Sequence, residues 1–218
     1  MLKNLLLFAL FITLHLSSKA DIPIVGTPVK DTVLLMNGEK VAGEVIDTIY
    51  HKIKVKYLKK NGKEKTILID DDLVFSVFFK DGHEKIVYEQ DTISGNYFGV
   101  EETRMFIRGE QDAEKYYHTP FGTISSVAVG FASGYFASVS FLAAIPPFVY
   151  SGILMAPRIR IKYKTVSTPE YLNYDTYVMG YEKVARRKKL FRSLIGGIGG
   201  LTAGIFTFQV AFPNFSIN

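Results

Sequence analysis

The residues best suited to chemistry in this sequence are carboxylates, and the clearest group is the run Asp70-Asp71-Asp72. Carboxylate oxygens are good ligands for hard cations such as Ca²⁺ and Mg²⁺. Three consecutive residues cannot all face one ion, however, and no second set of ligands stands at a suitable spacing around them. We therefore expect this run to form a solvated turn at the entry to a strand.

A second charged group, residues 108–114, includes Glu110 and Asp112 and is followed by His118. These residues could serve a hydrolase, but acids at this density also occur near helix N-termini, where they complement the helix dipole. The mature chain's histidines do not stand at metal-ligand spacing, and there is no Gly-x-Ser-x-Gly elbow. The sequence therefore predicts no catalytic residue, no metal site and no cofactor, and we expect a protein that is not an enzyme.

Glycines near the C-terminus resemble a nucleotide-binding loop in spacing alone. Gly199 and Gly204 stand at the outer positions of a phosphate loop, but Ile205 occupies the place that requires lysine. Thr202 similarly occupies the third glycine position of the dinucleotide pattern. A nucleotide-binding function is therefore excluded for this segment.

The same glycines belong to two series of small residues that recur every four positions. At this interval small residues form a groove along one helix face, and two backbones can approach closely in lipid. We predict that these faces pack against each other within one chain or build a homo-oligomer. They comprise Gly122, Ser126, Gly130, Gly134 and Ser138 in one segment, and Gly196, Gly200 and Gly204 in the next.

Both series lie in long uncharged segments. Residues 119–157 contain no Asp, Glu, Lys, Arg or His over 39 positions, and residues 194–212 contain none over 19. About 20 apolar residues cross a bilayer as a helix. We expect residues 122–144 to cross once, because Pro146-Pro147 would break the helix, with a re-entrant hairpin as the alternative. Residues 194–212 are expected to form a second transmembrane helix.

The region between these segments is strongly basic. Residues 121–193 carry 10 Lys and Arg against 3 Asp and Glu, whereas residues 21–120 carry 14 against 18. Because apolar segments bracket the basic region, its expected anionic partner is membrane lipid and not nucleic acid. By the positive-inside rule, residues 158–193 would be a cytoplasmic loop with an amphipathic helix that runs into the second span. The cations expected at the membrane surface are Arg158, Arg160, Lys183, Arg186, Arg187, Lys188, Lys189 and Arg192.

The N-terminal residues have the features of a secretory signal peptide. Lys3 supplies the positive charge, residues 5–16 the apolar region, and Ser18-Lys19-Ala20 a small-x-small cleavage site. Residues 1–20 are expected to be removed, although an uncleaved N-terminal anchor is the alternative. We expect a protein of the cell envelope, in the inner membrane with its N-terminal module in the periplasm.

Residues 21–95 are predicted to form that module, a small β-meander that curls into a barrel. Short β-rich runs are separated by the turn dipeptides Asn37-Gly38, Asn61-Gly62 and Asp81-Gly82. The expected strands are residues 32–36, 41–49, 53–58, 65–69, 73–79 and 85–88. Residues 21–91 are expected to fold alone. Residues 96–118 would add a connector and a juxtamembrane helix, with residues 95–107 extended or forming a further strand and residues 110–117 helical.

The order of these signals resembles the small Sm-like barrel. The similarity rests on residues 33–38 with Gly43, on Ile46-Asp47 followed by Tyr50-His51, and on residues 69–74. That family holds RNA bases with an Asn and an Arg-Gly pair, but His51 and Asp70-Asp71 stand at those places here. The resemblance therefore implies a shape without RNA binding, because an acidic run repels phosphate.

The layout as a whole is similar to that of exported Bacteroidetes envelope proteins of unknown function. The residues that carry this similarity are 109–117 before one apolar segment and 177–189 before the next. The resemblance implies location and architecture. The sequence thus predicts a β module followed by glycine-rich membrane helices. Its expected function is binding or scaffolding of an envelope protein partner, with a membrane-embedded oligomer or transport accessory as the alternative.

Overall fold

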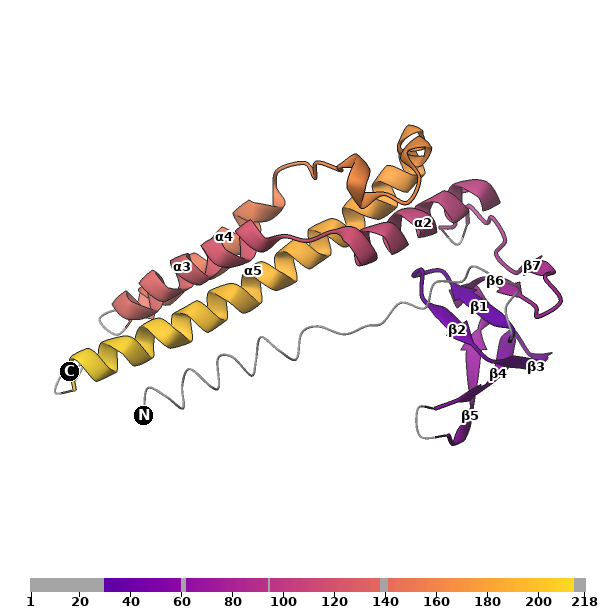
Figure 1. Cartoon of the computed structure of the whole chain (residues 1–218), viewed down its shortest axis with the longest axis horizontal. Helices are drawn as coiled ribbons and strands as arrows, with labels where there is room; N and C mark the ends of the chain where they lie inside the picture. The colour runs from indigo at the N-terminus through magenta and orange to yellow at the C-terminus, as the bar shows by residue number, and fades with distance from the viewer. Residues whose placement is uncertain (1–29, 60–61, 94, 138–140, 214–218) are drawn as a thin grey trace.

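A computed structural model describes residues 30–59, 62–93, 95–137 and 141–213 of the chain (Figure 1). A small β module lies at one end, and a long rod of helices extends away from it. The expected signal peptide, residues 1–20, lies outside the described residues, as do Asn61 and Ser138.

The module contains two antiparallel sheets in place of one closed barrel. The four-stranded sheet has the order β2-β1-β6-β7 and the three-stranded sheet the order β3-β4-β5. The strand bounds confirm the six predicted runs, the second of which is divided in two. The strands are β1 Thr32–Leu35, β2 Lys40–Ala42, β3 Glu44–Ile49, β4 Lys52–Leu58, β5 Glu64–Asp70, β6 Val74–Phe78 and β7 Glu84–Ile86.

Gly43 separates β2 from β3 and carries the chain from one sheet to the other. A Cβ atom at Gly43 would lie 2.6 Å from the carbonyl oxygen of Lys56, so the close approach of the two sheets requires glycine here. The sheets share one apolar core, made of Val33, Ile53, Val55, Ile69, Val74 and Val77.

The expected barrel closure is wrong, because the strands form two separate sheets and α2 packs on the outer face of one of them. Ile107 of α2 (Val100–Tyr116) packs with Leu34, Phe75 and Tyr88 on the face of the four-stranded sheet opposite the shared core. Both faces of β1 and β6 are buried as a result. A sheet covered on both faces no longer needs to close on itself to bury its apolar side chains.

Two kinds of turn connect the strands. Gly38, Gly62 and Gly82 have positive φ, as the Asn-Gly and Asp-Gly dipeptides predicted. The β3–β4 turn is different, because Tyr50 (φ 45°) and His51 (φ 58°) adopt this conformation without glycine. His51 is held there by Asp71, whose carboxylate lies 3.0 Å from its Nδ1. Asp71 belongs to the short helix η1 (Asp71–Leu73), so the acidic run is a turn, as expected.

Helix α2 begins earlier than predicted, and the expected extended segment over residues 100–107 is wrong. The N–H of Gly99 donates to the Glu102 carboxylate at 2.8 Å, and Glu101 and Glu102 stand in the first helical turn. Acids at these positions stabilise the helix start by pairing with free N–H groups and the helix dipole.

Three further α-helices build the rod. They are α3 (Pro120–Ala137), α4 (Pro146–Met155) and α5 (Asp175–Ala211), with the short helices η2 (Phe141–Ala144), η3 (Tyr163–Thr165) and η4 (Pro169–Asn173) between them. The predicted amphipathic helix and the last apolar segment form one continuous helix, α5, of 37 residues. Its rise of 1.5 Å per residue gives a length of about 55 Å.

Among the described residues, α5 is the one helix long and apolar enough to cross a membrane. Buried residues make up 28% of its most apolar 18-residue window. Most of that window therefore faces outward, unlike the core helix of a water-soluble domain.

Helices α3 and α4 form a hairpin, which has the geometry of the re-entrant alternative for residues 119–157. Helix α4 starts at Pro146-Pro147, where proline is accommodated in the first turn. It runs back beside α3 and α5, with Pro147 against Gly197 and its last turn near Arg186. The segment after α4 therefore returns to the end of the rod where α2 lies (Figure 1).

Candidate functional site: the helical rod and its cationic belt

The glycines predicted to pack helices lie where the backbones of α3 and α5 meet. A Cβ atom at Gly130 would overlap the carbonyl oxygen of Gly197, and one at Gly134 would overlap that of Leu201. From the opposite side, a Cβ at Gly200 would overlap the carbonyl oxygen of Val127. Gly196 and Gly204 approach Thr123 and Phe131 in the same way. The structure thus brings both series together within one chain.

The other small residues of the first series have different neighbours. Ser126 is fully buried beside Gly196, and its hydroxyl donates to the Gly122 carbonyl at 2.7 Å. Gly122 itself faces Thr119 and, across the hairpin, Leu154 of α4.

The same parallel register continues through α2. Gly180 faces the Phe106 carbonyl, Gly196 faces that of Thr123, and Gly200 faces that of Val127. In each pair the two residues are 73 or 74 positions apart in the sequence. Helices α2 and α3 therefore follow one line along α5 despite the break at residues 117–119. Helices α2 and α5 also make close contacts at Gly109 and Gly180, which the spacing of small residues did not predict.

Asp112 of α2 joins three elements above the apolar part of the rod. It is 8% exposed, and one carboxylate oxygen, Oδ2, accepts three hydrogen bonds. The Ser167 N–H donates at 2.8 Å, the Ser167 hydroxyl at 2.7 Å and the Tyr177 hydroxyl at 2.6 Å. Burial, and then the hydrogen bond to Asp112, raise the pKa of Tyr177 far above its usual range. Asp112 therefore holds the segment after α4 against α2 and α5.

Glu110, the other predicted carboxylate, is engaged in an ion pair at the crossing of α2 and α5. It is 4% exposed, and its Oε1 lies 2.7 Å from Nζ of Lys183. Its Oε2 is buried with no hydrogen-bond partner among the described residues. His118 follows α2 and does not join Glu110 and Asp112 in a shared site in the described part of the chain.

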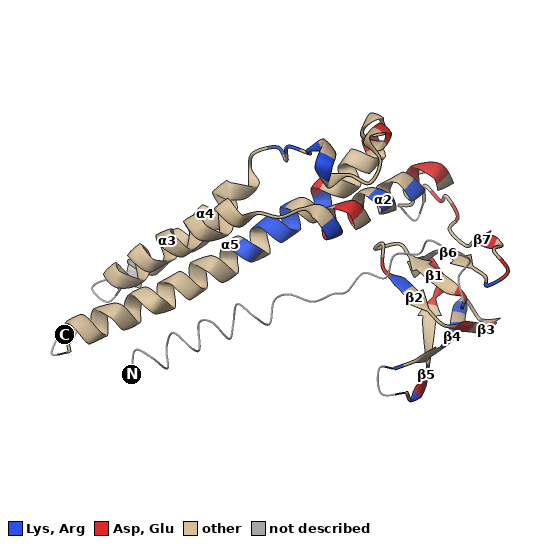
Figure 2. Ribbon diagram, in the orientation of Figure 1, with Lys and Arg blue, Asp and Glu red and all other residues tan. Residues whose placement is uncertain are grey.

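The predicted membrane-surface cations lie on α5 and on the segment after α4, between the charged and uncharged ends of the rod (Figure 2), and we call them the cationic belt. Two of them stabilise helix ends. Arg186 donates to the Met155 carbonyl at the end of α4, and Lys188 donates to the carbonyls of Ala113 and Glu114 at the end of α2. Carbonyls in the last helical turn lack intrahelical donors, and these cations supply hydrogen-bond donors to them.

The belt residues divide into cations that pair with a carboxylate and cations that do not. Arg187 lies 3.7 Å from the Glu114 carboxylate, and Arg186 also pairs with Glu182 at 3.1 Å. Burial lowers the pKa of Lys188, an effect that the Glu114 carboxylate opposes. Four cations have no carboxylate partner in the described part of the chain, namely Arg158, Arg160, Lys189 and Arg192.

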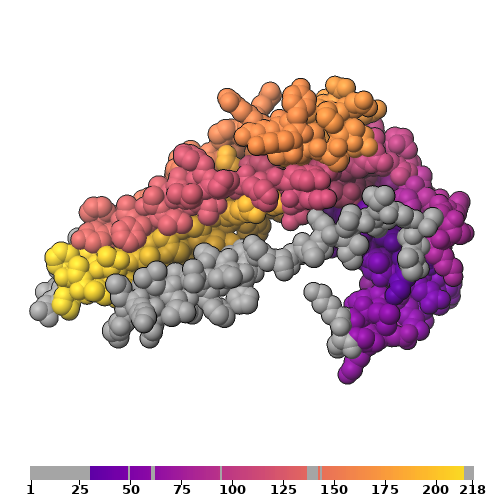
Figure 3. All heavy atoms as spheres, in the orientation of Figure 1, coloured from indigo at the N-terminus to yellow at the C-terminus, as the bar shows by residue number. Residues whose placement is uncertain are grey.

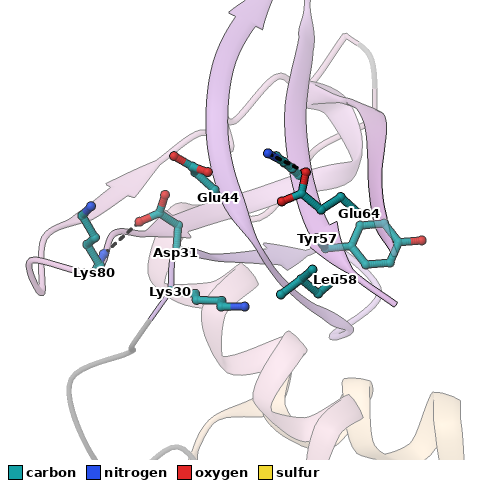
Figure 4. Close-up of a pocket in the computed structure, with 8 residues that line it drawn as sticks. Lys30, Asp31, Glu44, Tyr57, Leu58, Glu64 and Lys80 are labelled. Carbon is teal, nitrogen blue, oxygen red and sulfur yellow. Dashed lines mark hydrogen bonds and ion pairs between the residues drawn. The ribbon is translucent and has the colours of Figure 1, made fainter. Parts of the chain in front are cut away.

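A small open cavity of about 230 Å³ lies in the β module where its two sheets diverge (Figure 4). Its lining is balanced in charge. Asp31 accepts hydrogen bonds from the N–H groups of Val45 and Lys80 at 3.0 and 2.9 Å. Lys56 and Glu64 pair at 2.8 Å, and this hydrogen bond raises the pKa of Lys56. Asp31 and Glu64 therefore join neighbouring segments of the module at this cavity.

The spacing of the small residues predicted the glycine faces that meet, but nothing in the sequence indicated the role of Asp112. Its partners Ser167 and Tyr177 are 55 and 65 positions away, and no local spacing signals such pairing. The described residues contain no group of three or more His, Cys, Asp or Glu side chains that could hold a metal ion. No known protein family, curated protein or solved structure matches this chain.

Proposed function

We propose that this protein is a membrane-anchored scaffold that holds a β module at the membrane surface. In this proposal α3, α4 and residues 193–211 of α5 lie in the bilayer. Helix α2, the cationic belt and the two sheets lie outside it. The function is binding or scaffolding of an envelope partner by the module, without catalysis.

The observation that carries the proposal is the outer surface of the rod beyond the belt. Its described residues include no Asp, Glu, Lys, Arg or His, and large apolar side chains face outward. They include Phe121, Ile124, Phe136, Phe148, Val149, Ile153, Ile195, Ile198 and Val210. Large apolar side chains exposed on three neighbouring helices are typical of a surface that contacts a membrane or a protein.

The length of the uncharged part also supports insertion. Helix α3 has 18 residues, and residues 193–211 of α5 have 19. At 1.5 Å per residue these segments are about 27–29 Å long, close to the ~30 Å thickness of a hydrocarbon core. The hairpin return over η2 and α4 would then complete a bundle of three helical segments.

The glycine contacts support helix packing within one anchored chain over the joining of several copies into an oligomer. The faces of α3 and α5 that could join two copies are already packed against each other within one chain. The module is then fixed to the anchor, because α2 packs on the four-stranded sheet and continues the register of α3 along α5.

A charge placed on the outer surface of the rod tests the proposal. Ile198 of α5 is 50% exposed, and Leu68 of β5 is 59% exposed. If the rod lay in water, Ile198→Asp and Leu68→Asp would both be tolerated. In a bilayer an aspartate costs about 2.5–3.5 kcal/mol near the middle of a helix.

We expect Leu68→Asp to stay in the membrane fraction after an alkaline carbonate wash, as the unaltered protein does. Ile198→Asp should be depleted from that fraction. Release of the unaltered protein by carbonate, or equal behaviour of the two variants, would contradict membrane embedding.

A further inference from the structure

The segment after α4 carries cations that no part of the described chain neutralises. Glu110, Glu114 and Glu182 are the carboxylates that pair with the belt, and their partners all lie on α5. No ion pair in the described part of the chain uses the four cations after α4 or the last two of α5. These are Arg158, Arg160, Lys162, Lys164, Lys189 and Arg192.

Residues 158–162, which we call the cationic strap, alternate between core and surface. Ile159 is 8% exposed and belongs to the core that includes Tyr177 and Tyr181, and Ile161 packs against the same core. Arg158, Arg160 and Lys162 are exposed. In an extended chain, alternate residues share a face and lie about 7 Å apart. The buried Ile159 and the partly buried Ile161 therefore fix three cations in a row on the outside.

The strap begins where the apolar surface ends. Met155, the last residue of α4, is bound by Arg186, and Arg158 follows three positions later. Helix α4 exposes Phe148, Val149 and Ile153 just before this point. The space-filling view shows the segment after α4 lying over the rod on the outside of the molecule (Figure 3).

The headgroup layer on each side of a bilayer is about 5–7 Å thick, which matches the separation of Arg158 and Arg160. Two features of the strap fit phosphate in this layer. Guanidinium groups bind phosphate oxygens through two parallel hydrogen bonds, which makes arginine well suited to a phosphodiester. The isoleucines remove much of the conformational freedom that a mobile basic loop would lose on binding.

We propose that the cationic strap, together with Lys189 and Arg192, binds the headgroups of anionic phospholipids at the surface of the membrane. The inference rests on the proposed anchoring and adds a lipid class to it. The protein then prefers bilayers that contain an anionic phospholipid over bilayers of neutral lipid alone. The net charge of the strap, and its place beside an apolar surface, select a lipid headgroup over a protein partner in solution.

The experiment uses the full chain and two triple variants. One variant replaces the strap cations as Arg158→Gln, Arg160→Gln and Lys162→Gln. The matched control makes the same change in charge on the β module as Lys59→Gln, Lys80→Gln and Lys85→Gln, all exposed residues. Each protein is offered vesicles of phosphatidylcholine and vesicles with equal parts of phosphatidylcholine and phosphatidylglycerol. Distribution between the two is measured after separation at low salt.

We expect the full chain and the control variant to favour the vesicles that contain phosphatidylglycerol. A surface cation contributes roughly fivefold in affinity for an anionic membrane, so the strap variant should lose about a hundredfold of that preference. Added salt should reduce the preference of the full chain, because it screens surface charge.

Insertion into both kinds of vesicle without preference, or an unchanged preference in the strap variant, would overturn the lipid inference and leave the anchor intact. Failure to enter either kind of vesicle would overturn the anchor itself, and the lipid inference with it. Circular dichroism of the strap variant in neutral detergent shows whether its helices have formed, which separates lost binding from lost folding.

Discussion

Asp112 shows how a single carboxylate can set the path of a long segment. Its Oδ2 receives donors from Ser167 and Tyr177, so α2, α5 and the chain between α4 and α5 meet at one atom. Buried donors are costly when they lose their acceptor, and more so when that acceptor is charged. The folding of residues 158–174 against α2 therefore depends on this residue.

Replacement of Asp112 should destabilise the protein more than replacement of any one partner. We expect Asp112→Ala to lower the free energy of unfolding by about 3 kcal/mol and Tyr177→Phe by about 1 kcal/mol. Thermal unfolding in neutral detergent, followed by the near-ultraviolet circular dichroism of tyrosine, measures both. Glu170→Ala, at an exposed acid of the same segment, is the control. Equal stability of Asp112→Ala and Glu170→Ala would show that the carboxylate does not hold the segment.

Buried tyrosines at the same junction predict a limit at high pH. Burial raises the pKa of Tyr177, Tyr181 and Tyr117 in the folded protein, whereas unfolded tyrosine ionises near pH ~10. A pKa raised by folding gives stability that is complete below the unfolded pKa and is lost as pH rises above it. We expect unfolding to become easier above about pH 10.

Phenolate absorbance during an alkaline titration measures this effect. Tyr177→Phe should remove one of the tyrosines that ionise late. Ionisation of every tyrosine at one pH, before any loss of helix, would contradict the burial of this group.

At the scale of elements, the rod is held by backbone contact between parallel helices. Gly130 and Gly134 of α3 meet α5, and Gly200 of α5 meets α3, each at a carbonyl oxygen. Such approach gives extensive van der Waals contact, which is the main force between helices in lipid. The glycines on other faces are different, since nothing lies within 4 Å of a Cβ built at Gly152 or Gly199.

The contrast between these glycines gives a matched pair of variants. Gly134→Ala must push α3 away from α5, and we expect a loss of about 3 kcal/mol, typical of overpacking. Gly199→Ala meets no atom and should be neutral, or stabilising by up to about 1 kcal/mol through helix propensity. Helical circular dichroism during thermal unfolding in detergent compares them. A stable Gly134→Ala protein would mean that the helices are farther apart than the structure has them.

Local patterns predicted the elements well, and contacts between distant elements explain most of what they missed. The Gly38 and Gly82 turns and the continuous α5 followed from residue types alone. The division of the strands into two sheets did not, and neither did the cover that Ile107 gives to the outer face of the four-stranded sheet, because both depend on contacts between distant elements. The direction of α4 depends on packing with α3 and α5, and Pro146-Pro147 signals a break without giving the direction after it.

The position of Ile107 also changes what is expected of the module alone. Residues 21–91 lack α2, so Phe75 and Leu34 would lose their cover on one face of the sheet. Their exposure predicts that this fragment is marginally stable and that a fragment extended through Tyr116 resists protease better. Limited proteolysis of the two fragments measures the difference. Equal resistance would show that the two sheets are sufficient without the helix.

For the molecule as a whole, the hairpin decides which parts share a side of the membrane. The sequence predicted the β module and the basic segment on opposite sides, but Ser167 of that segment is hydrogen-bonded to Asp112 of α2, next to the module. In the proposed anchor both would therefore belong to one side of the membrane, and the end of α5 to the other. The positive-inside rule would put that side in the cytoplasm. We propose export, because the N-terminal segment is synthesised before the cations and has the features of a signal peptide.

Single cysteines test this arrangement, since the chain has no native cysteine. Suitable sites are Lys85 of β7, Lys164 after the strap and Ser216 beyond α5. Lys164 is exposed. A membrane-impermeant maleimide is applied to cells whose periplasm is accessible. We expect Lys85→Cys and Lys164→Cys to be modified alike and Ser216→Cys to be spared until the membrane is opened.

Modification of Ser216→Cys alone would keep the rod and reverse its orientation. Different labelling of Lys85→Cys and Lys164→Cys would contradict the hairpin itself, because one crossing of residues 119–157 is what would place a membrane between them.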